Sequence, residues 1–260
     1  MRLKSSVKNV AYGVSRMIMP RSGAVILAYH SIGTNRRPFT VSPEAFERQM
    51  QWLKESGCNI ISLDELTRYR ATGQIPPRTV AITFDDGYED NCTNAFPVLQ
   101  RYRVPATIFV TTGDLTGKKI SLRPLAKMND AQLRLLHESG LVAIEPHSDT
   151  HPTFTAISEG EIEREVRESK AYIEFLLKKN CRHFAYPRGH HSDAAHRVLA
   201  RCGISFGYGF GRGRVQPWHN PYALNRNGIG ADVSFAEFKG IASLGRLAAP
   251  AVLSAWSRRN

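Results

Sequence analysis

Short apolar runs alternate with segments of helical periodicity along most of the chain, and this alternation restricts the fold more than any other feature. Runs rich in β-branched and aromatic residues predict strands at residues 24–29, 79–84, 106–111, 141–144, 182–186 and 204–206, with a loop and strand at 217–226. Helices are predicted between them, at residues 42–57, 94–103, 129–139, 158–179, 192–202 and 235–241. Repeated β-then-α units indicate an α/β fold with parallel strands and outer helices, as an open sheet or a closed barrel.

Polar residues collect where the predicted strands end. The residues that follow a strand are His30, the pair Asp85 and Asp86 in "TFDDG", the pair His147 and His151 in "EPHSDTH", and the segment "YPRG" at 186–189. Parallel α/β folds place their chemistry at the carboxyl ends of the strands. We therefore expect these segments, which are far apart in the sequence, to form one site.

The residue types in this set indicate a metal site. Two adjacent carboxylates resist ionising together unless a cation or a proton relieves the repulsion. Two imidazoles four residues apart can converge on one cation, and one carboxylate completes a ligand set of the kind that hydrolytic zinc or iron sites use. One aspartate is then the third ligand, and the other is placed to take a proton from water. A two-metal phosphoesterase site is disfavoured because the loops hold few further acidic residues.

Three motifs in series, "TFDDG", "HSDTH" and "FAYPRG", resemble in order and spacing those of the polysaccharide deacetylase family, the NodB-homology domain of carbohydrate esterase family 4. The similarity extends from "ILAYHSIG" to "NPYALNRNGIG", roughly residues 24–240. The resemblance implies a distorted (β/α) barrel of about seven parallel strands, in agreement with the strand pattern. It also implies metal-assisted hydrolysis of N-acetyl groups on amino sugars, usually with Zn²⁺.

The resemblance also implies a role for each matching residue. Asp85 would be the general base that deprotonates water, and the metal ligands would be Asp86, His147 and His151. A backbone N–H near Arg188 would stabilise the oxyanion. The residues expected along the substrate groove and the oxyanion are Tyr186, Pro187, Arg188, Gly189 and Arg226.

Two positions depart from the family pattern. Many members carry an arginine shortly before the proline of the third motif, where it orients the catalytic aspartate, and this chain has Ala185 there. Many members also have a late L-x-H whose histidine protonates the leaving amine, and here Arg226 replaces that histidine. A guanidinium almost never donates a proton, because its pKa exceeds 12. His30 is therefore our first choice of general acid, ahead of His190, His191 and His219.

These observations predict a metal-dependent enzyme that removes N-acetyl groups from amino sugars of an oligosaccharide, polysaccharide or glycolipid precursor. A chitooligosaccharide deacetylase is one specific member of that class. The missing late histidine keeps a second hypothesis open, a catalytically weak or inactive barrel that binds carbohydrate. The net charge of +12 suits anionic partners, but no helix-turn-helix, zinc-finger or RNP signature is present, so we expect no nucleic-acid partner.

We divide the chain into three parts. Residues 1–22 are a basic amphipathic segment that could lie on a membrane or pack on its own domain, residues 23–240 are the deacetylase domain, and residues 241–260 are an apolar and basic tail. No clean secretory signal is recognised, so we expect a cytoplasmic or inner-membrane-associated location. The four cysteines lie far apart in sequence and are expected to be free thiols.

Overall fold

The computed structural model describes residues 23–117 and 125–244. Seven parallel strands form a continuous path in the order β7-β6-β5-β1-β10-β9-β8. In chain order they are β1 (Ala24–Tyr29), β5 (Thr79–Phe84), β6 (Ala106–Val110), β7 (Val142–Pro146), β8 (His183–Ala185), β9 (Phe206–Phe210) and β10 (Leu224–Gly228). An eighth strand, β4 (Asn59–Ile61), pairs with the first half of β5. The expected distorted barrel of parallel strands is confirmed.

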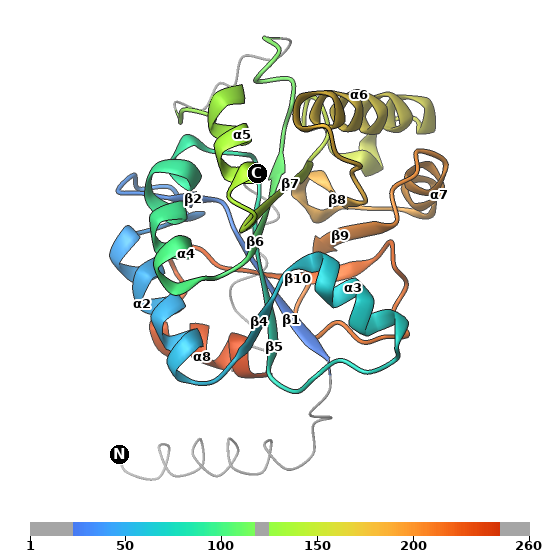
Figure 1. Ribbon diagram of the computed structural model, residues 1–260. Helices are drawn as coiled ribbons and strands as arrows, with labels where there is room; N and C mark the ends of the chain where they lie inside the picture. The colour runs from blue at the N-terminus through green and yellow to red at the C-terminus, as the bar shows by residue number, and fades with distance from the viewer. Residues whose placement is uncertain (1–22, 118–124, 245–260) are drawn as a thin grey trace, which may run out of the picture.

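Helices surround these strands (Figure 1). They are α2 (Pro43–Glu55), α3 (Leu63–Ala71), α4 (Phe96–Tyr102), α5 (Asp130–Glu138), α6 (Glu159–Leu177), α7 (Asp193–Arg201) and α8 (Phe235–Leu244). Local sequence fixes several of their starts, because a polar side chain satisfies a backbone N–H that has no partner within the helix. Capping boxes begin α5 at Asn129 and α6 at Ser158.

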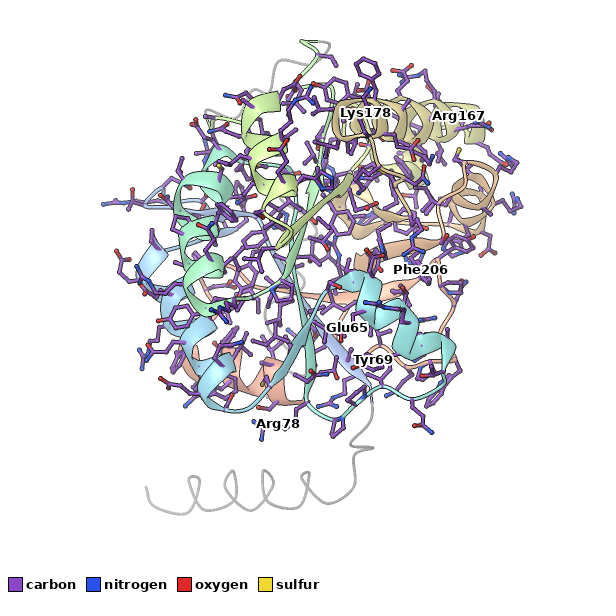
Figure 2. The ribbon with its side chains drawn as sticks, in the orientation of Figure 1. Glu65, Tyr69, Arg78, Arg167, Lys178 and Phe206 are labelled. Atoms are coloured by element: carbon purple, nitrogen blue, oxygen red, sulfur yellow. The ribbon has the colours of Figure 1, made fainter. Side chains whose placement is uncertain are left out.

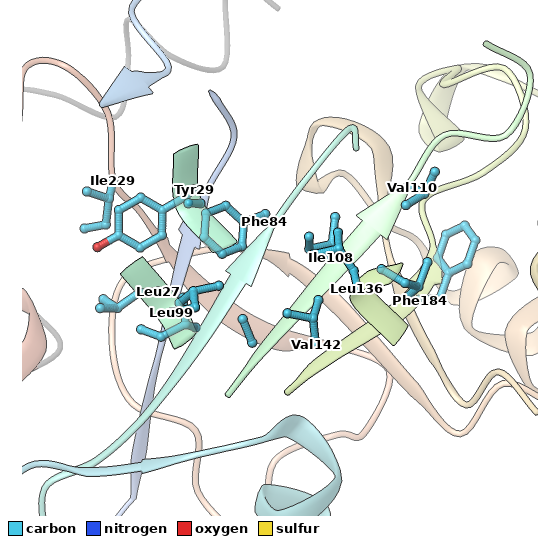
Figure 3. Packing of buried hydrophobic residues seen from close by; sticks show 14 of the residues in the cluster. Leu27, Tyr29, Phe84, Leu99, Ile108, Val110, Leu136, Val142, Phe184 and Ile229 are labelled. Carbon is cyan, nitrogen blue, oxygen red and sulfur yellow. The ribbon is translucent and has the colours of Figure 1, made fainter. Parts of the chain in front are cut away.

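Strands β1, β5, β6 and β8 each contribute to two separate cores because successive side chains point to opposite faces. In β1, Leu27 and Tyr29 face the outer helices, together with Phe84 from β5 (Figure 3). Ala24 and Ile26 face the barrel interior, which is a smaller apolar cluster. The strands therefore have hydrophobic residues on both faces, which explains why their sequences are nearly continuous apolar runs.

Helix α3 closes one end of the barrel. Leu63 and Leu66 from this helix are buried in the interior cluster. Tyr69 of α3 and Phe206 of β9, both labelled in Figure 2, also pack against this cluster. Neither α3 nor β4 was predicted from the sequence, although Ser62 caps the helix by accepting the N–H of Glu65. With this end filled by apolar side chains, the carboxyl ends of the strands form the open end of the barrel.

Side chains join the two edge strands, β7 and β8, which no strand pairing connects in the described part of the chain. The carboxylate of Glu145 on β7 accepts hydrogen bonds from the backbone N–H groups of Arg182 and His183, at 3.1 and 2.9 Å. Lys179 forms an ion pair with the same carboxylate and donates to the carbonyl of Ile144. Glu145 thus replaces part of a strand ladder and closes the barrel.

The remaining differences from the sequence analysis concern boundaries. Strand β9 begins at Phe206, where we expected a strand to end, and α8 continues past its predicted end at residue 241 to Leu244. All four cysteines are free. Among the described residues, no helix has the length and apolar character needed to cross a membrane. The predicted amphipathic segment 1–22 and residues 245–260 of the tail lie outside the described residues.

Substitution of Glu145 tests the side-chain closure of the barrel. Glu145→Gln removes the charge that pairs with Lys179 and weakens the acceptor of two buried backbone N–H groups. We expect the free energy of unfolding to fall by about 3 kcal/mol, as measured by urea denaturation. The matched variant Glu138→Gln, at an exposed position on α5, should change it by less than about 0.5 kcal/mol. Equal effects of the two substitutions would contradict this account.

Candidate active site

Three of the predicted residues converge at the open end of the barrel. The Oδ1 atom of Asp86 lies 3.4 Å from Nε2 of His151 and 3.7 Å from Nε2 of His147. One donor atom from each of the three lies within 4.8 Å of the other two, and this is the one such group of His, Cys, Asp and Glu side chains in the described residues. One carboxylate and two imidazoles at this spacing fit a single divalent cation.

The tautomer of His147 supports this interpretation. Its Nδ1 atom lies 2.7 Å from the carbonyl oxygen of Ala185, and a carbonyl can only accept, so Nδ1 carries the proton. This leaves Nε2 as the ring nitrogen that faces Asp86 and His151. Metal-binding histidines commonly hold their other ring nitrogen in this way. The position where the family pattern has an arginine therefore serves here as a backbone acceptor on β8.

Asp85 is paired with Arg226, and both side chains are fully buried. Two parallel hydrogen bonds of 2.6 and 2.8 Å join the guanidinium on β10 to the two oxygens of the carboxylate that follows β5. The guanidinium also lies between the rings of Phe109 and Phe210. Arg226 was expected at the substrate groove, but the structure buries it against Asp85, because a charged carboxylate inside the barrel needs a cation beside it.

The electrostatics of the site keep both aspartates ionised. Burial acts to raise the pKa of Asp85, but the charge and hydrogen bonds of Arg226, with His147 nearby, bring it below its usual value. Burial also acts to raise the pKa of Asp86, but Lys127 and the imidazole of His151 lower it well below the usual value. Lys127 donates to the backbone carbonyl of Asp86 at 2.7 Å.

His30 lies in the same group of residues. Its ring packs between Phe39 and Phe210, with centroid distances of 5.7 and 6.0 Å, and the residue is buried. Burial lowers the pKa of His30 below its usual value, although the charges of Asp85 and Asp86 act in the opposite direction. The structure thus brings His30 beside the aspartates, as its position after β1 indicated.

The "YPRG" segment forms a tight turn after β8. Gly189 donates its N–H to the carbonyl of Tyr186, and Arg188 adopts a left-handed backbone conformation with φ of 58°. A side chain at position 189 would collide with Phe210, so only glycine allows this close packing. Pro187 is buried and the Arg188 side chain is exposed. The ring of Tyr186 is not on the groove: it is fully buried, and its hydroxyl donates to the carbonyl of Tyr222.

The three weaker histidine candidates lie elsewhere. His190 is exposed, and Nδ1 of His191 lies 2.9 Å from Nε2 of His196, near the ring of Tyr186. His219 lies near the opposite end of the barrel, on the loop that pairs with the start of β1 through Val215. None of the three has a close contact with the Asp86 group among the interactions of the described residues.

Sequence reasoning missed the positions that support the site. Arg226 as the partner of Asp85, Lys127 beside Asp86, and Phe210 beside His30 were not recognised in these roles. A signal existed for Arg226, because the chain lacks the arginine expected at position 185 and has an additional one at position 226. No local signal marks Lys127 or Phe210, which reach the site only through the fold.

Comparisons with known proteins identify the family. The family model described as "Polysaccharide deacetylase" matches residues 72–207. A poly-β-1,6-N-acetyl-D-glucosamine N-deacetylase of Staphylococcus aureus (strain MSSA476) is 31% identical over 196 residues, which cover 72% of this chain and 67% of that protein. This chain belongs to the polysaccharide deacetylase family. The family predicted from the three sequence motifs is thereby confirmed.

Solved structures agree with the fold of this polysaccharide deacetylase. The Streptococcus pyogenes deacetylase PplD, in complex with acetate, superposes with a TM-score of 0.73 at 27% identity, covering 82% of this chain and 94% of that one. IcaB from Ammonifex degensii gives a TM-score of 0.75 at 22% identity, covering 91% of this chain and 97% of that one. The second similarity concerns the fold alone.

Replacing Arg226 tests the electrostatic pairing of Asp85. Arg226→Met leaves a buried carboxylate without its cation, so we expect a loss of about 3–5 kcal/mol of unfolding free energy at pH 7. In the wild type, the lowered pKa of Asp85 gives stability that is present above its unfolded pKa and is lost as the pH falls. In the variant, burial without the cation raises that pKa. Urea denaturation at several pH values should therefore show a difference in unfolding free energy between the wild type and Arg226→Met that is large at pH 7 and smaller near pH 3.

The matched control is Arg167→Met, which removes an exposed arginine paired with Glu163 on α6. Its effect should stay below about 1 kcal/mol at every pH, because exposed ion pairs contribute little. A loss of unfolding free energy for Arg226→Met that is small, or that does not change with pH, would show that the charge of Asp85 is not stabilised by its ion pair with Arg226.

Proposed function

We propose that this protein is a metal-dependent N-deacetylase that acts on N-acetylglucosamine residues of a β-1,6-linked glycan. The observation that carries the proposal is the convergence of Asp86, His147 and His151 beside an ion-paired Asp85. The linkage is supported by the staphylococcal relatives, whose names specify poly-β-1,6-N-acetyl-D-glucosamine as the glycan. Those names do not favour the chitooligosaccharide type over other members of the family.

Asp86, His147 and His151 would hold the divalent ion, which we propose to be Zn²⁺. When bound, such an ion polarises the acetyl carbonyl and lowers the pKa of water, which supplies the nucleophile at neutral pH. The protein contributes the geometry: the hydrogen bond from His147 to Ala185 orients one imidazole, and Lys127 fixes the backbone of Asp86.

Asp85 is proposed as the general base. Its Oδ2 atom lies 4.0 Å from Nε2 of His147, so its carboxylate is next to the proposed metal site without being one of the three converging ligands. Arg226 keeps the carboxylate ionised and fixes its orientation through two hydrogen bonds. As the water oxygen bonds to the acetyl carbon, Asp85 takes the proton that the water loses.

The oxyanion and the leaving amine need two further groups. We propose that the backbone N–H of Arg188 donates to the oxyanion, since the described hydrogen bonds of its turn involve the N–H groups of Gly189 and His190 instead. His30 is proposed to protonate the nitrogen of the sugar as the C–N bond breaks, giving acetate and an amine. Its imidazole lies near Asp85 and is not one of the three converging ligands, so it is available to act as the acid.

A peripheral contact of residues 1–22 with an anionic membrane, at a cytoplasmic or inner-membrane location, is a further part of the proposal. It is supported by the basic and apolar periodicity of that segment. A glycolipid precursor would then be an alternative form of the substrate. Cosedimentation with anionic vesicles by the full chain, but not by a chain lacking residues 1–22, is the expected result. Equal sedimentation of both would contradict it.

Acetate release from β-1,6-linked N-acetylglucosamine oligomers tests the function directly. We expect release that stops with a chelator and returns with added Zn²⁺, and slower release from chitooligosaccharides. Asp85→Asn should lower kcat/KM by about 10²–10⁴-fold, since it removes the base. The control Asp193→Asn, whose side chain is 96% exposed, should leave the rate unchanged. A folded wild type that releases no acetate with any divalent metal would favour the carbohydrate-binding barrel.

The role of His30 is tested by comparing leaving groups. His30→Gln should lower the rate of amide hydrolysis by about 10²-fold, because the departing amine must be protonated. The rate on p-nitrophenyl acetate, whose leaving group needs no proton, should fall much less. The imidazolium fraction of His30 and the His30-dependent rate should decline as pH rises, and because burial lowers the pKa of His30, this decline should occur at a lower pH than for an ordinary imidazole. An equal loss on both substrates would exclude the acid role.

A further inference from the structure

We infer that Glu165 on α6 is a positioning residue for the metal loop, which we define as residues 147–151. The inference rests on the proposed metal-dependent function, and it adds a residue that does not touch the metal site itself. Glu165 is a carboxylate with 1% of its surface exposed, located inside the outer layer of the barrel. A buried charge of this kind requires partners, and apart from Arg164 its partners lie in the metal loop.

The metal loop has an unusual backbone path. Ser148 and His151 both have positive φ, 70° and 60°, although neither is glycine. Left-handed conformations at such residues persist only where the surrounding structure fixes them. These two turns bring the ring of His151 back toward that of His147, with the ring centroids 5.0 Å apart. The geometry of the proposed metal site therefore depends on whatever holds the middle of this loop.

Glu165 holds that middle segment with both of its oxygens. Oε2 accepts the backbone N–H groups of Asp149 and Thr150, at 3.0 and 2.6 Å. Oε1 accepts the hydroxyl of Thr150 at 2.7 Å, and the guanidinium of Arg164 donates to the same oxygen at 2.8 Å. A single carboxylate thus satisfies three donors of the two residues that lie between Ser148 and His151.

The segment that follows β6 holds the loop from another direction. Thr112 donates its hydroxyl to Oδ1 of Asp149 at 2.7 Å and its N–H to the carbonyl of Ser148. Gly113 donates to the carbonyl of Asp149, and a Cβ atom at position 113 would lie 2.6 Å from that oxygen. These contacts fix Ser148 and Asp149, whereas Glu165 also fixes Thr150, the residue directly before the ligand His151.

Loss of the Glu165 carboxylate should therefore weaken the binding of the metal before it affects the chemistry. Glu165→Gln keeps the size of the side chain but removes the charge and places an amide N–H₂ group among N–H donors. We expect the Kd of the metal-free full chain for Co²⁺, followed by the visible absorbance of the bound ion, to rise about 10–100-fold, as is typical when a group behind a metal ligand is lost.

The matched control is Glu163→Gln on the same helix. Glu163 pairs with Arg167 and Arg201 and has no contact with the metal loop among the hydrogen bonds of the described residues. Its Co²⁺ affinity and acetate release should stay within about twofold of the wild type. A second variant, Thr150→Val, removes a single hydroxyl contact and keeps the test available if Glu165→Gln does not fold. We expect Thr150→Val to raise the Kd for Co²⁺ by a smaller factor than Glu165→Gln does. In the double variant Glu165→Gln/Thr150→Val, the loss of binding free energy should be smaller than the sum of the two single losses.

Two results would overturn the inference alone. In the first, a folded Glu165→Gln binds Co²⁺ as tightly as the wild type, with only its unfolding temperature lowered. In the second, Glu165→Gln does not fold and Thr150→Val has the wild-type Kd. A wild-type protein that binds no Co²⁺ and releases no acetate would instead overturn the proposed function, on which the inference rests.

Discussion

Asp85 and Asp86 are adjacent, buried and both charged, and the organisation of the site follows from how each is stabilised. Burial disfavours both charges, so each carboxylate needs its own positive or hydrogen-bonding partners. Asp85 receives the guanidinium of Arg226, and Asp86 receives Lys127 and the two imidazoles. This division separates the roles of the two residues: Asp85 is held in an ion pair inside the barrel, and Asp86 faces His147 and His151.

The barrel makes this division possible. Arg226 on β10 reaches Asp85 because β1 lies between β10 and β5 in the strand order. His147 reaches Asp86 because β6 lies between β7 and β5, and it is oriented by β8 through the carbonyl of Ala185. Glu145 closes the edge between β7 and β8, and His147 lies two residues further along the chain, directly after the end of β7. The closure of the barrel and the orientation of a proposed metal ligand therefore depend on the same short segment.

The sequence was sufficient for the fold class, for most of the strands and for the group that contains Asp86, His147 and His151, because strand ends follow from apolar periodicity. Strand β4 was missed because three residues are too few to show a pattern. The partner of Asp85 was missed because it lies 141 positions away, and sequence spacing carries no information on which strands are neighbours. Ala185 and Arg226 were recognised as two separate departures, whereas in the fold Arg226 on β10 orients Asp85, the role that the resemblance gives to an arginine at position 185.

The most direct test of this account is the crystal structure of the Zn²⁺-loaded protein, with the ion located by its anomalous scattering. We expect one ion, bound by Asp86, His147 and His151 at about 2.0–2.2 Å, with Asp85 outside the ligand set and still paired with Arg226. An ion bound through Asp85, or the separation of Asp85 from Arg226 when the ion is bound, would contradict the division of roles between the two aspartates. So would an ion located away from the two histidines.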